Sequence, residues 1–212
     1  MEHQVDSSHP MEIPLFPLNT VLFPGGHLAL RIFEPRYLSM VSDCLRNDRP
    51  FGVVRIRDGS EAGDPATFHE TGTFARIFDF NQLDSGLLGL SCLGTERFRV
   101  IDHSVREDNL SIGKVKILPD MLDDSVSVDL SLHFQSVTEF LRTALDREEM
   151  EEYRKNLKED WEDSSWISFQ TAELLPLSDE SRQSLLEMSI AERILELGIV
   201  LRDNEISFQV AE

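Results

Sequence analysis

The chain has 212 residues, of which 41% are hydrophobic and 28% charged, a length and composition typical of a soluble protein with one or two folded domains. Its two cysteines are too few for a disulfide framework or a four-ligand zinc site. The formal net charge of −19 opposes approach to phosphate backbones and anionic lipids, which argues against a general nucleic-acid-binding protein.

The amino-terminal residues and the two cysteines bear on the compartment. Residues 1–10 are polar and hold no basic segment followed by an apolar run, so we expect a flexible tail without a secretory signal. No stretch approaches the roughly 18 apolar residues that a membrane span needs. We therefore expect a cytoplasmic protein without membrane association, in which Cys44 and Cys92 are reduced, buried and apolar in behaviour.

Residues 11–119 carry the signals of a β-rich domain with one inserted helix. Two prolines hold residues 13–18 extended, and alternation of apolar and polar residues predicts a strand over 28–33. Pro35 is suited to the first turn of a helix, along which apolar residues then recur every four positions until the helix stops before Pro50.

Further strands are predicted after this helix. They are residues 51–57, 73–80, 87–93, 98–101 and 111–118. In the stretch 73–80, aromatic residues occupy most even positions, while Ala75 and Ile77 occupy odd ones, so both faces of the strand need cover. This pattern favours a closed barrel over an open sheet. Gly94 interrupts its strand and indicates a bulge or tight bend.

Residues 120–212 are predicted to form an acidic helical domain. They hold 23 acidic and 8 basic residues, against 16 and 12 in residues 1–119. Apolar residues follow the helical period from position 130 to 145, but strict alternation over 125–133 leaves the start of this helix open. Near the end, Ser189 and Glu192 match a capping box that would begin the last helix.

Sequence motifs for catalysis or cofactor binding are not found. The chain has no P-loop, no Gly-x-Ser-x-Gly elbow, no His-Glu-x-x-His pair and no dinucleotide fingerprint. Its six histidines are scattered singly, and the acidic loop 58–64 lacks the calcium-loop spacing. We therefore expect no catalytic residues, no metal and no cofactor.

Three short segments are candidates for a binding surface. Residues 31–37 combine two arginines, a glutamate, a phenylalanine and a tyrosine, which suits a docking edge with aromatic and arginine anchors, or a strand-to-helix corner whose rings are core. Two phenylalanines in 73–80 form an apolar patch if exposed, or pack beneath a helix. The two arginines in 96–99 are one strand period apart on one face, where they either face a ligand or form ion pairs within the barrel. The predicted binding residues are Arg31, Phe33, Glu34, Arg36, Tyr37, Phe78, Phe80 and Arg97.

Several stretches, taken in order, resemble the Lon N-terminal substrate-binding domain. Its opening is matched by Ile-Pro-Leu-Phe-Pro-Leu at 13–18, Val-Leu-Phe-Pro-Gly at 21–25 and Ile-Phe-Glu-Pro-Arg-Tyr at 32–37. Later landmarks are Gly-Thr at 72–73, Gly-Thr-Glu-Arg-Phe at 94–98, Leu-Pro-Leu at 175–177, Gln-Ser-Leu-Leu-Glu at 183–187 and Arg-Ile-Leu at 193–195. The resemblance implies an α+β fold: a PUA-like β-barrel of about six strands with one inserted helix over 11–119, then a helical bundle over 120–212.

The resemblance also implies a function. In Lon proteases, an ATPase module and a Ser–Lys protease module follow this domain, whereas this sequence shows no Walker motif and has no room for either. We expect a non-catalytic module that binds unfolded or extended polypeptide segments, with a protease or chaperone as a candidate partner. A PUA-like barrel that binds a small molecule or RNA remains the alternative, and the charge opposes RNA.

Overall fold

The structure, a computed structural model, describes residues 10–83, 86–120, 128–155 and 157–203. It divides into two compact units, residues 1–119 and 120–212, and the division falls where the excess of acidic residues begins. Of the predicted amino-terminal tail, only Pro10 lies within the described residues.

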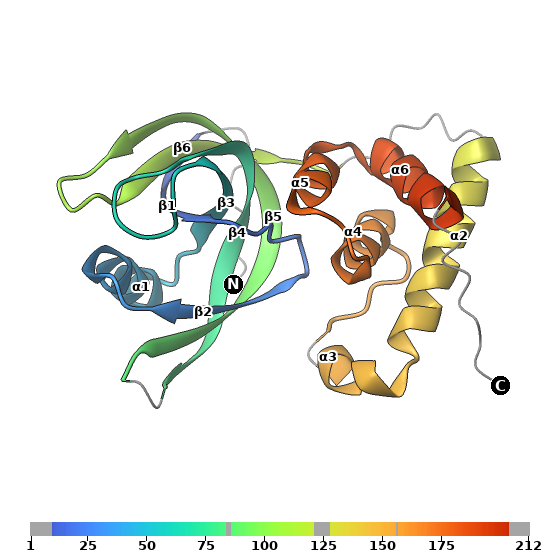
Figure 1. Cartoon of the computed structure of the whole chain (residues 1–212), viewed down its shortest axis with the longest axis horizontal. Coiled ribbons are helices and arrows are strands. Elements are labelled where there is room, and N and C mark those ends of the chain that lie inside the picture. The colour runs from blue at the N-terminus through green and yellow to red at the C-terminus, as the bar shows by residue number, and fades with distance from the viewer. Residues whose placement is uncertain (1–9, 84–85, 121–127, 156, 204–212) are drawn as a thin grey trace. The chain divides into compact units, whose positions relative to one another are not determined.

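The first unit is built from six strands and one helix. In chain order these are β1 (Met11–Leu18), β2 (His27–Ile32), α1 (Pro35–Asn47), β3 (Phe51–Asp58), β4 (Thr67–Gln82), β5 (Leu88–Val105) and β6 (Ser111–Leu118) (Figure 1). Neighbouring strands follow the order β2-β5-β4-β3-β1-β6, and β6 also pairs with β5. The pairings therefore run from β5 through β4, β3, β1 and β6 and back to β5, so these five strands form a ring. Strand β2 pairs with β5 as a sixth strand. This confirms the predicted α+β fold with about six strands and one inserted helix.

Strand β5 pairs with β4 and, in successive stretches, with both β2 and β6. Residues 88–93 pair with β2, and residues 97–105 pair with β6. Between them the register against β4 shifts, at the point where Ala75 faces Gly94. A Cβ atom on Gly94 would lie 2.2 Å from the carbonyl oxygen of Phe23, so only glycine allows this approach. The bulge expected from the sequence at Gly94 lies here.

Two apolar clusters lie on opposite faces of the strands. Along β1, Ile13 and Leu15 join one cluster with Phe98, while Phe16 and Leu18 join the other. The second cluster lies under α1, whose buried face includes Tyr37, Met40, Val41 and Cys44. Because successive side chains of a strand point to opposite faces, both faces of β1 contribute apolar side chains to a core cluster. This is expected for strands that are covered on each side.

The second unit consists of helices. They are α2 (Val128–Leu145), η1 (Glu148–Met150), α3 (Glu151–Lys155), α4 (Ser164–Leu174), α5 (Asp179–Glu187) and α6 (Ile190–Asp203). Helix α2 packs against α4 and α6. The alternation that left the start of α2 open is helical from Val128 onward, and residues 125–127 lie outside the described residues.

The predicted capping box begins α6. The Ser189 hydroxyl accepts a hydrogen bond from the backbone N–H of Glu192 at 3.3 Å, and the Glu192 carboxylate accepts one from the backbone N–H of Ser189 at 2.9 Å. These two bonds satisfy donors that a helix start otherwise leaves open, which fixes where α6 begins.

No described helix is both long and apolar enough to cross a bilayer.

Candidate functional site

A small hollow lies beside strand β2. It measures about 300 Å³, and its lining is Phe16, Leu18, residues 29–34, Tyr37, Glu61 and Ala62. Four of the predicted binding residues are therefore brought together here: Arg31, Phe33, Glu34 and Tyr37. The volume is at the low end for ligand pockets and suits one or two side chains.

The hollow adjoins strand edges that lack a neighbour on one side. Within the described residues, β2 pairs only with β5, so its other edge carries no strand. In β1, residues 15–18 pair with β3, and the ladder to β6 stops at Pro14. Unpaired strand edges present backbone N–H and C=O groups that an extended peptide can use.

Aromatic side chains flank β2 at both ends. Phe33 directly follows β2 and is 59% exposed. Phe78 is 55% exposed, and its ring stands edge-on to His27, the first residue of β2, with centroids 5.7 Å apart. Large apolar groups exposed in pairs are typical of interaction surfaces.

Phe78 and Phe80 are exposed and lie at, or just after, an irregularity in β4. The register against β5 shifts between Ile77 and Asp79, so Phe78 has no direct partner across the ladder. Phe80 is 57% exposed and is in register with Leu90 of β5, which is in register with Leu30 of β2. Phe80 therefore lies in the same cross-strand row as Leu90 and Leu30.

The arginines of the predicted site are placed differently. Arg31 is exposed on β2, whereas Arg36 and Arg97 are only 6% and 5% exposed. Arg36 pairs with Glu34 at 2.9 Å and donates to the carbonyl of Asn109 at 2.8 Å, so it fixes the start of α1 to the loop before β6. Arg97 is buried in the strand ring, away from the hollow.

Tyr37 forms the floor of the hollow. Its ring stacks on Phe16 with centroids 4.0 Å apart, and the Arg36 guanidinium lies 4.7 Å from the ring centroid. Burial raises the pKa of Tyr37, and the charge of Arg36 opposes that shift while the carboxylates of Glu34 and Glu61 add to it. Glu34, Arg36 and Tyr37 thus form a packed corner between β2 and α1, which was one of the two interpretations of residues 31–37. Phe33, in contrast, is exposed.

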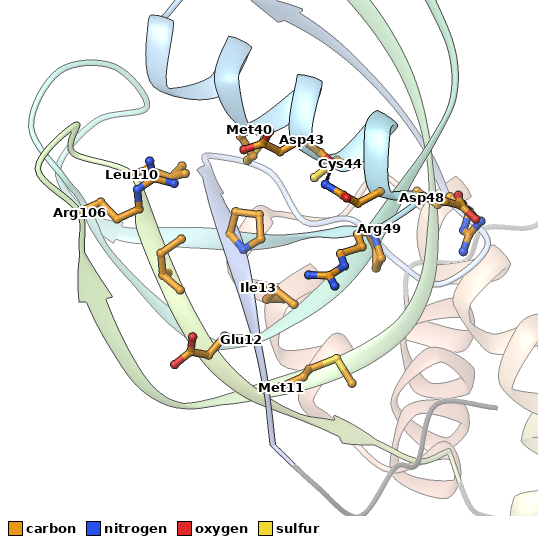
Figure 2. Close-up of a pocket in the computed structure, with 15 residues that line it drawn as sticks. Met11, Glu12, Ile13, Met40, Asp43, Cys44, Asp48, Arg49, Arg106 and Leu110 are labelled. Atoms are coloured by element: carbon orange, nitrogen blue, oxygen red, sulfur yellow. Dashed lines mark hydrogen bonds and ion pairs between the residues drawn. The ribbon is translucent and has the colours of Figure 1, made fainter. Parts of the chain in front are cut away.

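A second and larger hollow was not foreseen from the sequence. It measures about 1180 Å³ and lies between α1 and the first half of β1 (Figure 2). Its lining is Met11, Glu12, Ile13, Pro14, Met40, Asp43, Cys44, Asn47, Asp48, Arg49, Pro50, Arg76, Arg106, Leu110 and Ile112. These residues come from four stretches of the chain, 11–14, 40–50, 76 and 106–112, so no local pattern could have revealed the hollow.

The cysteines are free and buried, as expected. Burial raises the pKa of Cys44 to about 11 and that of Cys92 to about 12. Thiols in such surroundings stay protonated near neutral pH and are poor nucleophiles. Within the part of the chain that the structure describes, no cluster of three or more His, Cys, Asp or Glu side chains is arranged to hold a metal ion.

Comparison with known proteins places this fold. The model of the ATP-dependent protease La (LON) substrate-binding domain matches residues 12–202. The Lon N-terminal domain protein from Xanthomonas campestris is 36% identical, with a TM-score of 0.66 over 88% of this chain and 96% of that one. The N-terminal domain of the Lon protease from the Mycobacterium avium complex shares the fold at 14% identity, with a TM-score of 0.68 over 92% of this chain and 100% of that one.

Longer proteins also match. Protein cereblon of Xenopus tropicalis is 28% identical over 135 residues, which is 62% of this chain and 29% of that protein. Lon protease 1 of Herpetosiphon aurantiacus is 24% identical over 212 residues, which is 91% of this chain and 24% of that protein. The chain thus spans less than a third of these relatives. Because the family model covers most of its length, the chain belongs to the family of LON substrate-binding domains.

Proposed function

We propose that the protein binds extended, apolar polypeptide segments and carries out no chemical step on them. The observation that carries this proposal is the unpaired edge of β2 beside a hollow with apolar walls, in a chain of the LON substrate-binding family. A peptide that adds to a free strand edge gains backbone hydrogen bonds, and its alternate side chains enter pockets beside that edge.

The two ends of β2 define the length of the bound segment. Phe33 at one end and Phe78 at the other would contact apolar side chains of a peptide lying along the six residues of β2. Covering a half-exposed phenylalanine contributes on the order of 1 kcal/mol, at ~25 cal/mol per Å² of apolar surface. The hollow over Tyr37 would receive one further side chain.

Charge gives the site a preference. Glu34 and Glu61 line the hollow, and the whole chain has a net charge of −19. Peptides that combine apolar and basic residues should therefore associate faster than acidic ones, and salt should weaken this preference. The same net charge opposes RNA binding, and Arg97, one of the predicted binding residues, is buried.

Backbone-methylated peptides test strand addition directly. A fluorescent, apolar eight-residue peptide is titrated with the full chain, beside two versions N-methylated on alternate residues in the two possible registers. We expect one methylated register to lose binding and the other to keep it, because only one set of N–H groups faces β2. Equal binding of all three peptides would contradict strand addition, and no binding of any would contradict the function.

The cellular setting is part of the same proposal. Lon proteases are named among the relatives, so we propose that the protein holds a polypeptide for a separate protease or chaperone in the cytoplasm. The buried, free thiols of Cys44 and Cys92 are compatible with a reducing compartment. Turnover of peptide bonds or nucleotides by the purified protein would overturn the non-catalytic part of the proposal.

A further inference from the structure

The large hollow under α1 has an apolar floor. Met11 and Ile13 of β1, Met40 and Cys44 of α1, and Ile112 of β6 contribute to it. At about 1180 Å³ it exceeds the ~300–1,000 Å³ typical of ligand pockets. It therefore has room for several side chains, unlike the small hollow beside β2.

Most charges around this hollow are neutralised locally. Asp48 pairs with Arg76 at 3.0 Å. Asp43 pairs with Arg46 at 3.3 Å, and Arg106 pairs with Asp108 at 3.2 Å. These pairs hold their charges at the rim, where they are solvated and contribute little to the attraction of a ligand.

Arg49 differs from these arginines. Its guanidinium has no ion-pair or hydrogen-bond partner among the described residues. Figure 2 shows its side chain beside Ile13, and shows the carboxylate of Glu12 on the other side of β1. Arg49 is exposed, so the arrangement places one solvated positive charge at the edge of an apolar floor whose lining also includes Glu12.

The end of α1 sets the direction of Arg49. Asp48 adopts a left-handed conformation, with φ 47° and ψ 51°, and the backbone N–H of Arg49 donates to the carbonyl of Cys44 at 3.0 Å. Such a helix end reverses the chain over the last turn. The reversal brings Arg49 back over the side of α1 that carries Cys44.

We propose that this hollow binds the carboxyl terminus of a polypeptide, with the terminal carboxylate on Arg49 and the last apolar side chains on the floor. The inference rests on the proposed function, because the ligand is again a polypeptide. Guanidinium and carboxylate form paired, charge-assisted hydrogen bonds, and an anion at this point meets a positive charge in a chain that otherwise repels it. A chain end needs only one path out of the hollow, whereas an internal acidic residue needs two.

A pair of peptides isolates the carboxylate. Two labelled six-residue peptides share an apolar sequence, and one ends in a free acid while the other ends in an amide. Fluorescence anisotropy with the full chain should show that the acid binds about 10-fold more tightly, the value of one charge-assisted contact of ~1.4 kcal/mol. Arg49→Gln should abolish this difference, and Arg49→Lys should keep part of it.

Arg57→Gln is the matched control. Arg57 lies on β3, is exposed and does not line the hollow, so its replacement removes the same charge and should leave the acid preference unchanged. Equal binding of acid and amide, or an acid preference that survives Arg49→Gln, would overturn the proposal. Displacement by decanoate without any binding of the peptide acid would reassign the hollow to a small apolar carboxylate and also overturn it.

The test is separable from that of the proposed function. A peptide with both ends blocked reports only on internal segments, and Phe33→Ser should weaken its binding while leaving the acid preference of the other pair intact. Acid binding that appears only after residues 1–9 are removed would assign the hollow to the chain's own amino-terminal segment instead, and would overturn the assignment to a partner.

Discussion

The guanidinium of Arg193 lies 3.5 Å from the ring centroid of Phe169, and both side chains are fully buried. The same guanidinium donates from Nε to the hydroxyl of Ser168 at 2.8 Å and from a terminal nitrogen to the carbonyl of Met188 at 3.2 Å. A carboxylate oxygen of Asp120 stands 3.7 Å away. A charged residue of α6 thus joins α4, the end of α5 and the first residue of the helical unit.

Replacement of Arg193 should therefore destabilise the helical unit. We expect Arg193→Ala to lower the free energy of unfolding by about 3–4 kcal/mol, because it opens a cavity and leaves the Met188 carbonyl and Ser168 without their partner. Arg193→Lys should cost about 2 kcal/mol, since an ammonium cannot reproduce the planar fork. Both tryptophans, Trp161 and Trp166, lie in this unit, so their fluorescence during urea unfolding reports on it.

Arg202→Ala is the control for this prediction. Arg202 lies on the same helix, is exposed and pairs only with the neighbouring Asp203 among the described residues, so its loss should change stability by less than about 0.5 kcal/mol. Similar losses for Arg193→Ala and Arg202→Ala would show that burial of the guanidinium does not stabilise the unit.

The strand ring should tolerate glycine replacement very unevenly. A Cβ atom on Gly72 would lie 2.3 Å from the backbone carbonyl oxygen of Val53, which cannot move without breaking the β3–β4 ladder. On Gly113, the near contacts are all to the side chain of Leu15, which can change rotamer. Gly72→Ala should cost more than about 2 kcal/mol and Gly113→Ala less than about 1.5 kcal/mol, measured by thermal unfolding followed by circular dichroism. The reverse order would contradict this account.

The fold could be predicted because its signals are local. The prolines of residues 13–18, the apolar stripe after Pro35 and the capping box at Ser189 each constrain a short stretch, and the structure contains the corresponding elements. The alternation of apolar and polar residues over 125–133 did not decide between a strand and a helix. A helix that is apolar on a broad face can also show apolar residues at every second position over a short stretch. The helix from Val128 is selected by packing against α6, which no local pattern records.

The candidate site could be predicted only in part. Phe74, Phe78 and Phe80 all occupy even positions of β4, but Phe74 is buried while Phe78 and Phe80 are exposed. The register against β5 shifts after Ile77, and because a bulge of this kind depends on the partner strand, the strand period alone could not place Phe78 and Phe80. Arg49 carried no signal at all, because an arginine after a helix is ordinary until its surroundings are known.

Exposed aromatic side chains make the peptide-binding proposal testable at little cost to stability. Phe33→Ser and Phe78→Ser should each weaken binding of an apolar peptide by about 5-fold, and the double variant by about 20-fold or more, because each removes on the order of 1 kcal/mol of apolar contact. Both residues are more than half exposed, so the unfolding temperature should change little. Isothermal titration calorimetry measures the affinities.

Leu132→Ser provides the matched control for the aromatic variants. Leu132 is 61% exposed on α2 in the helical unit, so its replacement removes a comparable apolar group that is not part of the strand unit. Its affinity for the peptide should equal that of the wild type. A loss of affinity as large as that of Phe33→Ser would indicate binding through general surface hydrophobicity rather than through the edge of β2.

Buried thiols should make the strand unit sensitive to alkaline pH. Burial, with a smaller contribution from Asp43, raises the pKa of Cys44 to about 11, and burial followed by the nearby Cys44 raises that of Cys92 to about 12, from an ordinary value of 9.0. Below pH 9 the thiols are protonated in both the folded and the unfolded chain, so their full contribution to the free energy of unfolding is present. Above pH 9 the unfolded chain loses these protons first, so stability falls as the pH rises toward 11, by up to about 1.4 kcal/mol per pH unit for each thiol.

Comparison with a variant lacking both thiols separates this effect from other titrations. Cys44→Ala combined with Cys92→Ala should be less stable at pH 7, because it leaves small cavities, yet its unfolding free energy should decline less steeply between pH 9 and pH 10.5. Lysine and tyrosine titrations occur in both proteins and cancel in the difference. Parallel declines would mean that the folded protein lets these thiols ionise as readily as the unfolded chain does, and a rapid reaction of the native protein with iodoacetamide at pH 8 would lead to the same conclusion.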